Sequence, residues 1–275
     1  QEAGMRIETV KLIYFSPTGT TKIILDSVTA GLGAGRASSV DLTLPEVRKD
    51  CRLSIEEDVV IIGVPVYAQR LPHFLYDCLK NIEGRGKPVV LVCVYGNIHS
   101  GIALGELQGL CTEKGLVVAG GAKFIGEHSF CCSELALAGG RPDSKDLRLA
   151  EEFGKEIRGK LSGTDDLSAL AVALPRGRLS LAARVIPPNG ERLVTRQPNA
   201  DISTCNRCGV CSRTCPMGAI DPETMGINEH FCTRCFSCVR KCPAGSRSIV
   251  FKKRWIVMTY LRSNSRVRKE PDIYI

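Results

Sequence analysis

The first 160 residues alternate short apolar runs with segments in which apolar residues recur at helical spacing. The runs predict strands at 10–15, 38–42, 58–66, 87–95 and 116–124. The intervening segments predict helices at 22–32, 71–82, 102–114 and 141–161, the last capped by Asp143 or Ser144. This alternation indicates an α/β fold with a five-stranded, doubly wound parallel sheet. Ligands bind such sheets at the carboxyl ends of the strands.

Beyond residue 162 the pattern loses its regular period, and we expect four units along the chain. Residues 5–162 form the α/β domain, and 163–200 a linker with one short helix around 165–173. Residues 201–250 are rich in cysteine, and 251–275 form a basic tail. Within the tail, 254–262 is apolar enough for a short helix or strand, and it contains Trp255, the only tryptophan.

Two segments repeat one cysteine pattern, C-x2-C-x2-C-x3-C-P: CNRCGVCSRTCP at 205–216 and CTRCFSCVRKCP at 232–243. This is the spacing of bacterial ferredoxins, in which the fourth cysteine of each copy binds the other cluster. The pattern predicts a two-[4Fe–4S] ferredoxin-like α+β domain. One cluster is assigned to Cys205, Cys208, Cys211 and Cys242, and the other to Cys232, Cys235, Cys238 and Cys215.

Zinc binding, disulfide formation and inert burial account for the repeated cysteines less well. A structural zinc site uses four ligands and needs neither a third C-x2-C step nor the proline. Disulfide scaffolds are typical of small secreted domains, and the chain shows no secretory signal. Inert buried cysteines would not keep one spacing twice. Outside the repeats, Cys51, Cys78, Cys93 and Cys111 are expected to be small core residues, and the adjacent Cys131 and Cys132 to be structural.

The composition is that of a globular protein, with 44% hydrophobic and 24% charged residues in a chain of 275. The apolar run PVVLVCVY (88–95) has the length of a buried strand, and no run reaches the length of a membrane span. Fourteen cysteines without a secretory signal indicate a reducing compartment, and we expect a cytoplasmic protein of an anaerobe.

The net charge of +8 is concentrated at the C-terminal end. Residues 201–275 contain 13 Lys and Arg against 6 Asp and Glu, a net of +7, which leaves +1 for the first 200. Two oxidised clusters and a flavin phosphate would each contribute about −2, bringing the total to about +2. The basic residues therefore do not predict nucleic-acid binding. A basic surface that docks an acidic redox protein is expected instead.

The loop SPTGTT (16–21) joins the first strand to the first helix with four hydroxyl side chains and one glycine. A helix N-terminus binds anions through its free N–H groups, and the hydroxyls add further donors. The loop is neither a Walker A sequence nor a G-x-G-x-x-G motif. A simple helix cap also explains Ser and Thr here, so both interpretations stay open at this point.

Further segments resemble a known family. SPTGTT is similar to the phosphate-binding loop of flavodoxins, which have this five-stranded fold and bind FMN. GVPVYAQRLP (63–72), VYGNIHSG (94–101), FIGEHSF (124–130) and RPDSKDLRLAEEFG (141–154), followed by the cysteine repeats, resemble flavodoxin–ferredoxin fusion proteins of anaerobic bacteria and archaea. The resemblance covers about residues 8–250. It implies FMN in the first domain and two [4Fe–4S] clusters in the second.

The resemblance also implies the FMN-binding residues. The phosphate would be held by Ser16, Thr18, Gly19, Thr20 and Thr21. The isoalloxazine ring would lie between two loops, with Tyr67 and Tyr95 as stacking candidates. These loops contain Pro65, Val66, Tyr67, Ala68 and Arg70 on one side and Tyr95, Gly96 and Asn97 on the other. The chain departs from the family pattern in two places. Flavodoxins commonly have Asn at the position of Thr20. The fusion family tends to have polar and acidic residues after Tyr-Gly-Asn, whereas this chain has Ile98, His99, Ser100 and Gly101, a difference expected to affect the environment of the ring and the flavin potentials.

The sequence GEHS places Glu127, His128 and Ser129 after the fifth strand. Three consecutive residues cannot readily align as nucleophile, base and orienting acid, so a hydrolase is not indicated. We expect a loop at the cofactor edge or the domain interface, or a hydrogen-bonded anchor. His73 and His230 are expected to be surface or capping residues.

These features favour an electron-transfer protein that exchanges electrons between two clusters and FMN and delivers them to a protein partner. The alternative is an FMN-dependent reductase of a bound small molecule, with His99, Arg70 and Glu127 as polar groups over the flavin. A third interpretation is an iron–sulfur module or sensor without flavin. No NAD(P) signature is present, no catalytic residue is indicated, and the oligomeric state, including a homodimer, stays open.

Overall fold

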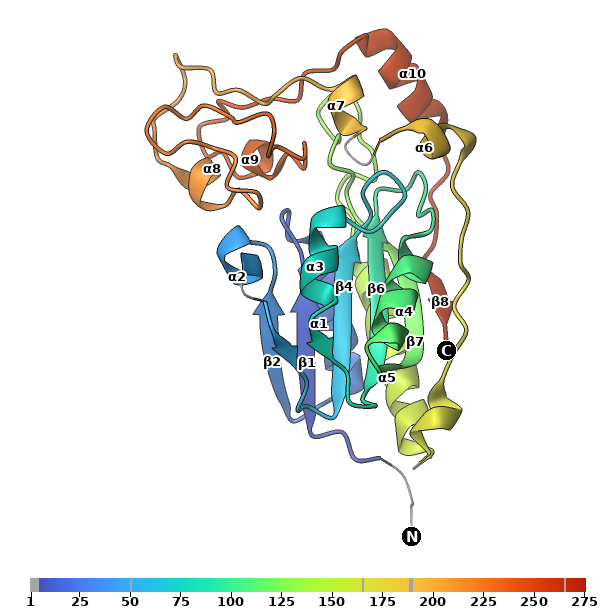
Figure 1. Ribbon diagram of the computed structural model, residues 1–275. Coiled ribbons are helices and arrows are strands. Elements are labelled where there is room, and N and C mark those ends of the chain that lie inside the picture. Colours follow the sequence, from blue (N-terminus) through green and yellow to red (C-terminus); the bar gives the residue numbers. More distant parts are fainter. Residues whose placement is uncertain (1–4, 50, 165, 188–189, 265) are drawn as a thin grey trace.

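The computed structural model describes residues 5–49, 51–164, 166–187, 190–264 and 266–275 (Figure 1). Its main sheet has the strand order β2-β1-β4-β6-β7-β8 within the described residues. The first five of these strands are parallel, and their order is the 2-1-3-4-5 order of the flavodoxin-like fold. The strands are β1 (Thr9–Tyr14), β2 (Arg36–Asp41), β4 (Val59–Pro65), β6 (Pro88–Tyr95), β7 (Val117–Ile125) and β8 (Asp272–Tyr274). The α/β expectation is therefore confirmed.

Helices cover both faces of this sheet. On one face α1 (Thr20–Leu32) and α5 (Ser144–Ser162) pack on the strands, and on the other α3 (Tyr76–Leu79) and α4 (Ala103–Glu113) do so. Every residue of β6 is buried, as expected for a central strand covered on both sides. Short elements complete this part: α2 (Pro45–Lys49), η1 (His73–Leu75) and a two-stranded sheet of β3 (Leu53–Ser54) and β5 (Ile82–Glu83).

The remaining elements lie mostly above the carboxyl ends of the parallel strands (Figure 1). They are α6 (Leu181–Val185), α7 (Glu191–Val194), α8 (Val210–Arg213), α9 (Ser237–Arg240) and α10 (Arg254–Asn264). Near the opposite end, η2 (Leu167–Leu170) falls within the range where the linker was expected to be helical. The apolar segment 254–262 is helical, within α10.

The sheet differs from the expected one by its sixth strand. The tail returns to the sheet, and β8 pairs antiparallel with β7, from Gly121 opposite Tyr274 to Lys123 opposite Asp272. The Lys123 ammonium lies 3.3 Å from the Asp272 carboxylate and donates to the Tyr274 hydroxyl at 3.1 Å. The tail therefore forms an edge strand of the sheet. A strand of three residues is too short to be predicted from its sequence pattern.

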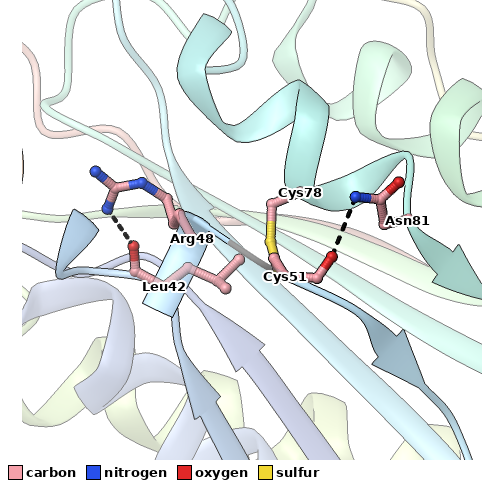
Figure 2. Close-up of a disulfide and its surroundings, with 5 residues drawn as sticks. All are labelled: Leu42, Arg48, Cys51, Cys78 and Asn81. Atoms are coloured by element: carbon pink, nitrogen blue, oxygen red, sulfur yellow. Dashed lines mark hydrogen bonds between the residues drawn. A yellow bond between two sulfur atoms is a disulfide. The ribbon is translucent and has the colours of Figure 1, made fainter. Parts of the chain in front are cut away.

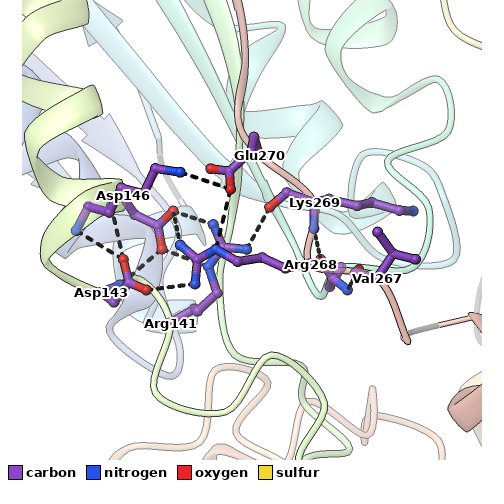
Figure 3. A network of polar contacts seen from close by, with 9 residues as sticks. Arg141, Asp143, Asp146, Val267, Arg268, Lys269 and Glu270 are labelled. Carbon is purple, nitrogen blue, oxygen red and sulfur yellow. Dashed lines mark hydrogen bonds and ion pairs between the residues drawn. The ribbon is translucent and has the colours of Figure 1, made fainter.

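A polar network attaches the tail next to α5 (Figure 3). Arg141 and Asp146 form an ion pair that is almost fully enclosed, with Nε to Oδ2 at 2.7 Å. Arg141 also donates to the carbonyl oxygen of Lys269, and Arg268 pairs with Asp143, both at 2.7 Å. Asp143 caps α5 in a capping box with Asp146, which confirms one of the two expected caps.

Helices α1 and α5 pack unusually closely because glycines face the partner backbone. A Cβ on Gly154 would overlap the carbonyl oxygen of Val28, whereas a Cβ on Gly159 of the same helix would meet no atom. We expect Gly154→Ala to lower the free energy of unfolding by about 1–3 kcal/mol through overpacking. Gly159→Ala should raise it by about 0.5–1 kcal/mol, since alanine favours helix. Urea unfolding of both variants measures this, and equal effects would contradict the close packing.

Cys51 and Cys78 form a disulfide, with their Cα atoms 5.3 Å apart (Figure 2). Both residues are buried core residues, as expected, and their bond to each other was not predicted from the sequence. Asn81, which follows α3, donates to the Cys51 carbonyl oxygen at 3.1 Å. Cys93 and Cys111 are buried free thiols, as predicted.

Candidate electron-transfer site

The two cysteine repeats adopt the same backbone conformation. Two residues after the first cysteine, Arg207 and Arg234 have left-handed backbones with φ of 53° and 56°. Two residues further, Gly209 and Phe236 have φ of 70° and 57° and begin α8 and α9. Non-glycine residues rarely adopt this conformation. Each copy therefore winds its first three cysteines into the same tight turn.

The structure brings the fourth cysteine of the first copy to the second copy. Burial, followed by the charges of Cys215 and Cys232, raises the pKa of Cys235 to about 12. Burial and the charges of Cys235, Cys232 and Cys215 likewise raise the pKa of Cys238. Cys215 thus acts electrostatically on Cys235 and Cys238 of the other repeat, and the charge of Cys232 of that repeat acts on Cys215. The crossed grouping of all eight cysteines, which the spacing predicts, stays a prediction.

The environment of the repeats suits a bound cluster. Arg234, between two of the cysteines, is 1% exposed, and its Nε and Nη1 find no hydrogen-bond partner in the described residues. Orphaned buried donors are rare in proteins. The backbone N–H of Ala219 donates to the Cys215 sulfur at 3.3 Å, the kind of bond that tunes cluster potentials. Within the described residues, no three His, Cys, Asp or Glu side chains are grouped to bind one single ion.

A cavity of about 470 Å³ lies between the carboxyl ends of the strands and the cysteine-rich segment. Its wall includes most of the residues that the resemblance implies for FMN: Thr18, Thr20, Thr21, Pro65, Val66, Tyr67, Ala68, Tyr95 and Gly96. Cys235 is on the same wall. The cavity therefore joins the three strand-end loops to one of the cysteine turns.

The loop before α1 has the geometry of an anion site. Gly19 occupies the N-cap with φ of 90°, and a Cβ there would meet no atom, so the left-handed backbone is what requires glycine. No side chain caps the helix at this residue. Thr18 and Thr20 place their hydroxyls 3.4 Å apart beside the helix N-terminus. This arrangement fits a phosphate held by N–H groups and hydroxyls.

Comparison with known proteins agrees with this geometry for the cysteine-rich part. Residues 197–243, which contain all eight cysteines of the two repeats, match the family described as "4Fe-4S dicluster domain". The chain joins a flavodoxin-like sheet to a 4Fe-4S dicluster domain. Residues 197–243 are called the dicluster domain below.

Solved structures resemble the flavodoxin-like part more distantly. A Fusobacterium nucleatum flavodoxin bound to flavin mononucleotide is 19% identical, covering 56% of this chain and 99% of its own, with a TM-score of 0.40. A Bacillus cereus flavodoxin 2 is 19% identical over 55% of this chain and 99% of its own, with a TM-score of 0.41. The fold assignment rests on the strand order. A comparison with curated proteins gives no match.

Four residues implied for FMN are not among those that line the cavity: Ser16, Gly19, Arg70 and Asn97. Ser16 accepts a hydrogen bond from the Lys22 backbone at 3.1 Å and so braces the start of α1. Arg70 pairs with Glu106 of α4 at 3.2 Å. The Asn97 amide binds the tail, donating to the Val267 carbonyl oxygen at 2.9 Å and accepting from the Lys269 backbone at 3.0 Å.

The roof of the cavity was not visible in the sequence. It is formed by α6, α7 and α10 together with the Thr233–Cys235 turn of the dicluster domain. Ile256, Val257, Tyr260 and Leu261 of α10 line it, and the apolar character of 254–262 was the only signal for them. Helix α7 contributes Glu191 and Val194, and no pattern in the sequence predicted this helix.

The GEHS loop joins the two parts of the chain. The Glu127 carboxylate pairs with Arg240 of the dicluster domain, which also donates to the His128 carbonyl oxygen at 2.7 Å. A second contact runs from the Ser237 hydroxyl to the Pro17 carbonyl oxygen at 2.6 Å. Burial lowers the pKa of His128 to about 4, so it is a neutral acceptor for the Phe130 N–H. The expectation of a loop at the domain interface is confirmed.

Glu191 is an acid on the cavity wall with an altered pKa. Burial raises the pKa of its carboxyl to about 7, opposed by a hydrogen bond from the Ala68 backbone and by the charge of Arg192. Because this pKa lies above the ordinary value, the fold favours the protonated form. The contribution of Glu191 to the free energy of unfolding is therefore fully present at low pH and is lost as the pH rises from about 4.5 through about 7.

We expect Glu191→Gln to remove this pH dependence. The interval from the ordinary value of 4.5 to about 7 corresponds to roughly 3 kcal/mol of unfolding free energy. In anaerobic urea unfolding the variant should match the wild type at about pH 5 and exceed it at about pH 8. Glu113→Gln, at an exposed position, is the control. Identical pH profiles of Glu191→Gln and wild type would show that the carboxyl is ionised throughout.

Proposed function

We propose that the protein exchanges electrons between two [4Fe–4S] clusters and FMN and delivers them to an acidic redox protein in the cytoplasm. The observation that supports this most directly is that Cys235 and the three strand-end loops share one cavity wall. A cluster ligand and the proposed flavin site are therefore neighbours. In this proposal residues 5–162 supply the flavin site and residues 201–250 the clusters.

The contacts suggest an order for the two clusters. The proximal cluster is the one proposed for Cys215, Cys232, Cys235 and Cys238, because Cys235 reaches the cavity. The distal cluster is the one proposed for Cys205, Cys208, Cys211 and Cys242. Cys208 is exposed, so this cluster would be the one closer to solvent and to an external donor or acceptor.

The flavin site would be built from this chain as follows. Thr18, Thr20 and Thr21 with the N-terminus of α1 would bind the phosphate, while Tyr67 and Tyr95 would flank the ring. FMN, when bound, accepts one or two electrons and so links one-electron clusters to two-electron chemistry. Among the described residues, each helix is too short or too polar to traverse a lipid bilayer.

The test is anaerobic purification with quantitation of iron, acid-labile sulfide and flavin. We expect about eight irons, about eight sulfides and one FMN per chain, since each cubane holds four of each. Eight irons without flavin, even after FMN is added, would contradict the flavin site and leave a dicluster protein. Reduced protein is then mixed with an acidic ferredoxin or with small acceptors. Faster oxidation by small acceptors would favour a reductase over a carrier.

A further inference from the structure

Arg48 of α2 links the flavodoxin-like part of the chain to the residue that follows Cys215. Its guanidinium donates to the carbonyl oxygen of Leu42 at 2.5 Å (Figure 2). The same nitrogen donates to the carbonyl oxygen of Thr43 at 2.8 Å. The other nitrogen donates to the carbonyl oxygen of Pro216, the residue after Cys215. It also lies 3.8 Å from the Met217 sulfur. One side chain thus contacts both parts across 168 positions of sequence.

The surroundings of Arg48 hold the charge in place. The guanidinium carbon lies 5.7 Å from the centre of the Phe15 ring and 5.2 Å from that of Phe74. Such cation–π contacts stabilise a cation that is partly removed from water. Arg48 is half-buried, and burial lowers its pKa, opposed by the charges of Glu46 and then Cys215. A fixed positive charge therefore stands beside one ligand of the proximal set.

A cation at this place has a predictable effect on redox equilibrium. Reduction adds one electron, and so one negative charge, to a cluster held by four thiolates. A nearby positive charge in a partly desolvated site stabilises the reduced form more than the oxidised form. We propose that Arg48 raises the reduction potential of the proximal cluster relative to the distal one. This rests on the proposed function in its assignment of Cys215 to the proximal set, and it would make electrons collect beside the cavity.

The experiment is a redox titration of both clusters in the full chain, followed by electron paramagnetic resonance. Arg48→Gln removes the charge, and Arg48→Met removes it while keeping apolar contact with the two phenylalanine rings. Arg48→Lys keeps the charge but loses the paired hydrogen bonds. Lys49→Gln removes one exposed charge from the same helix and is the matched control. Iron content is measured for each variant so that only fully loaded protein is compared.

We expect Arg48→Gln and Arg48→Met to weaken one-electron reduction of the proximal cluster about tenfold, which is about 59 mV. The affected signal must be the one that Cys215→Ala removes, and the distal cluster should keep its potential. Arg48→Lys should retain most of the wild-type value, and Lys49→Gln all of it. Unchanged potentials in both neutral variants would overturn the proposal, as would a shift in Arg48→Lys as large as in Arg48→Gln. Because the titration needs no flavin, absence of FMN would refute the flavin site without affecting this result.

Discussion

Cys215→Ala is expected to reduce the iron content from about eight to about four per chain and to stop electron transfer to the cavity. The reason is that Cys215 acts on Cys235 and Cys238 of the other repeat, so that in the proposed crossed assignment its loss opens the proximal cluster rather than that of its own repeat. Alanine is used because a serine oxygen could still bind iron. Iron and sulfide analysis with electron paramagnetic resonance measures the effect.

Double variants decide the crossed assignment. Cys215→Ala combined with Cys235→Ala should lose no more iron than either alone, since both ligands belong to one cluster in the proposed assignment. Cys215→Ala combined with Cys211→Ala should lose both clusters. Cys132→Ser, a free cysteine outside the repeats, is the control and should keep full iron content. If the pair from one repeat behaved as a single site, each repeat would bind its own cluster and the crossed grouping would be refuted.

Asp146→Asn is expected to lower the free energy of unfolding by about 3–5 kcal/mol, the largest effect on stability that we predict. Asp146 is fully buried and Arg141 is 6% exposed, so the change leaves a buried guanidinium without its counter-charge (Figure 3). Asp146 also accepts a hydrogen bond from the Asp143 backbone at 2.9 Å, and the capping box of α5 would be weakened. Anaerobic urea unfolding, followed by circular dichroism and by cluster absorbance, measures the loss.

The same helix supplies the control for this prediction. Glu151 and Lys155 pair at 2.7 Å on the exposed side of α5, one turn apart. Glu151→Gln should cost about 0.5 kcal/mol or less, because surface pairs are screened by water. Replacing Arg141 and Asp146 together by Met and Leu should recover part of the loss, since no charge is then left buried. A loss below about 1 kcal/mol in Asp146→Asn, which is the range of surface pairs, would contradict the enclosed pair.

The sequence by itself was sufficient for features that depend on local spacing. Apolar runs and helical periods predicted the five parallel strands and the helices α1, α4 and α5, because strands and helices bury side chains with fixed periods. The cysteine repeats predicted the dicluster domain, because cluster ligation fixes the number of residues between thiols. The SPTGTT loop was located for a similar reason, since a strand end followed by a helix start is a local feature.

Only the tertiary structure decided which distant segments meet. Arg48 reaches Pro216, and Asn97 binds Lys269 across 172 positions, and no spacing rule connects such residues. Contacts between distant segments also form the pairing of β8 with β7, the disulfide between Cys51 and Cys78 and the roof of the cavity. Each depends on the shape that the packed sheet presents to a remote part of the chain. The periodicity of apolar residues shows which side of a helix or strand is buried. The shapes of the folded surfaces determine which other segment it packs against.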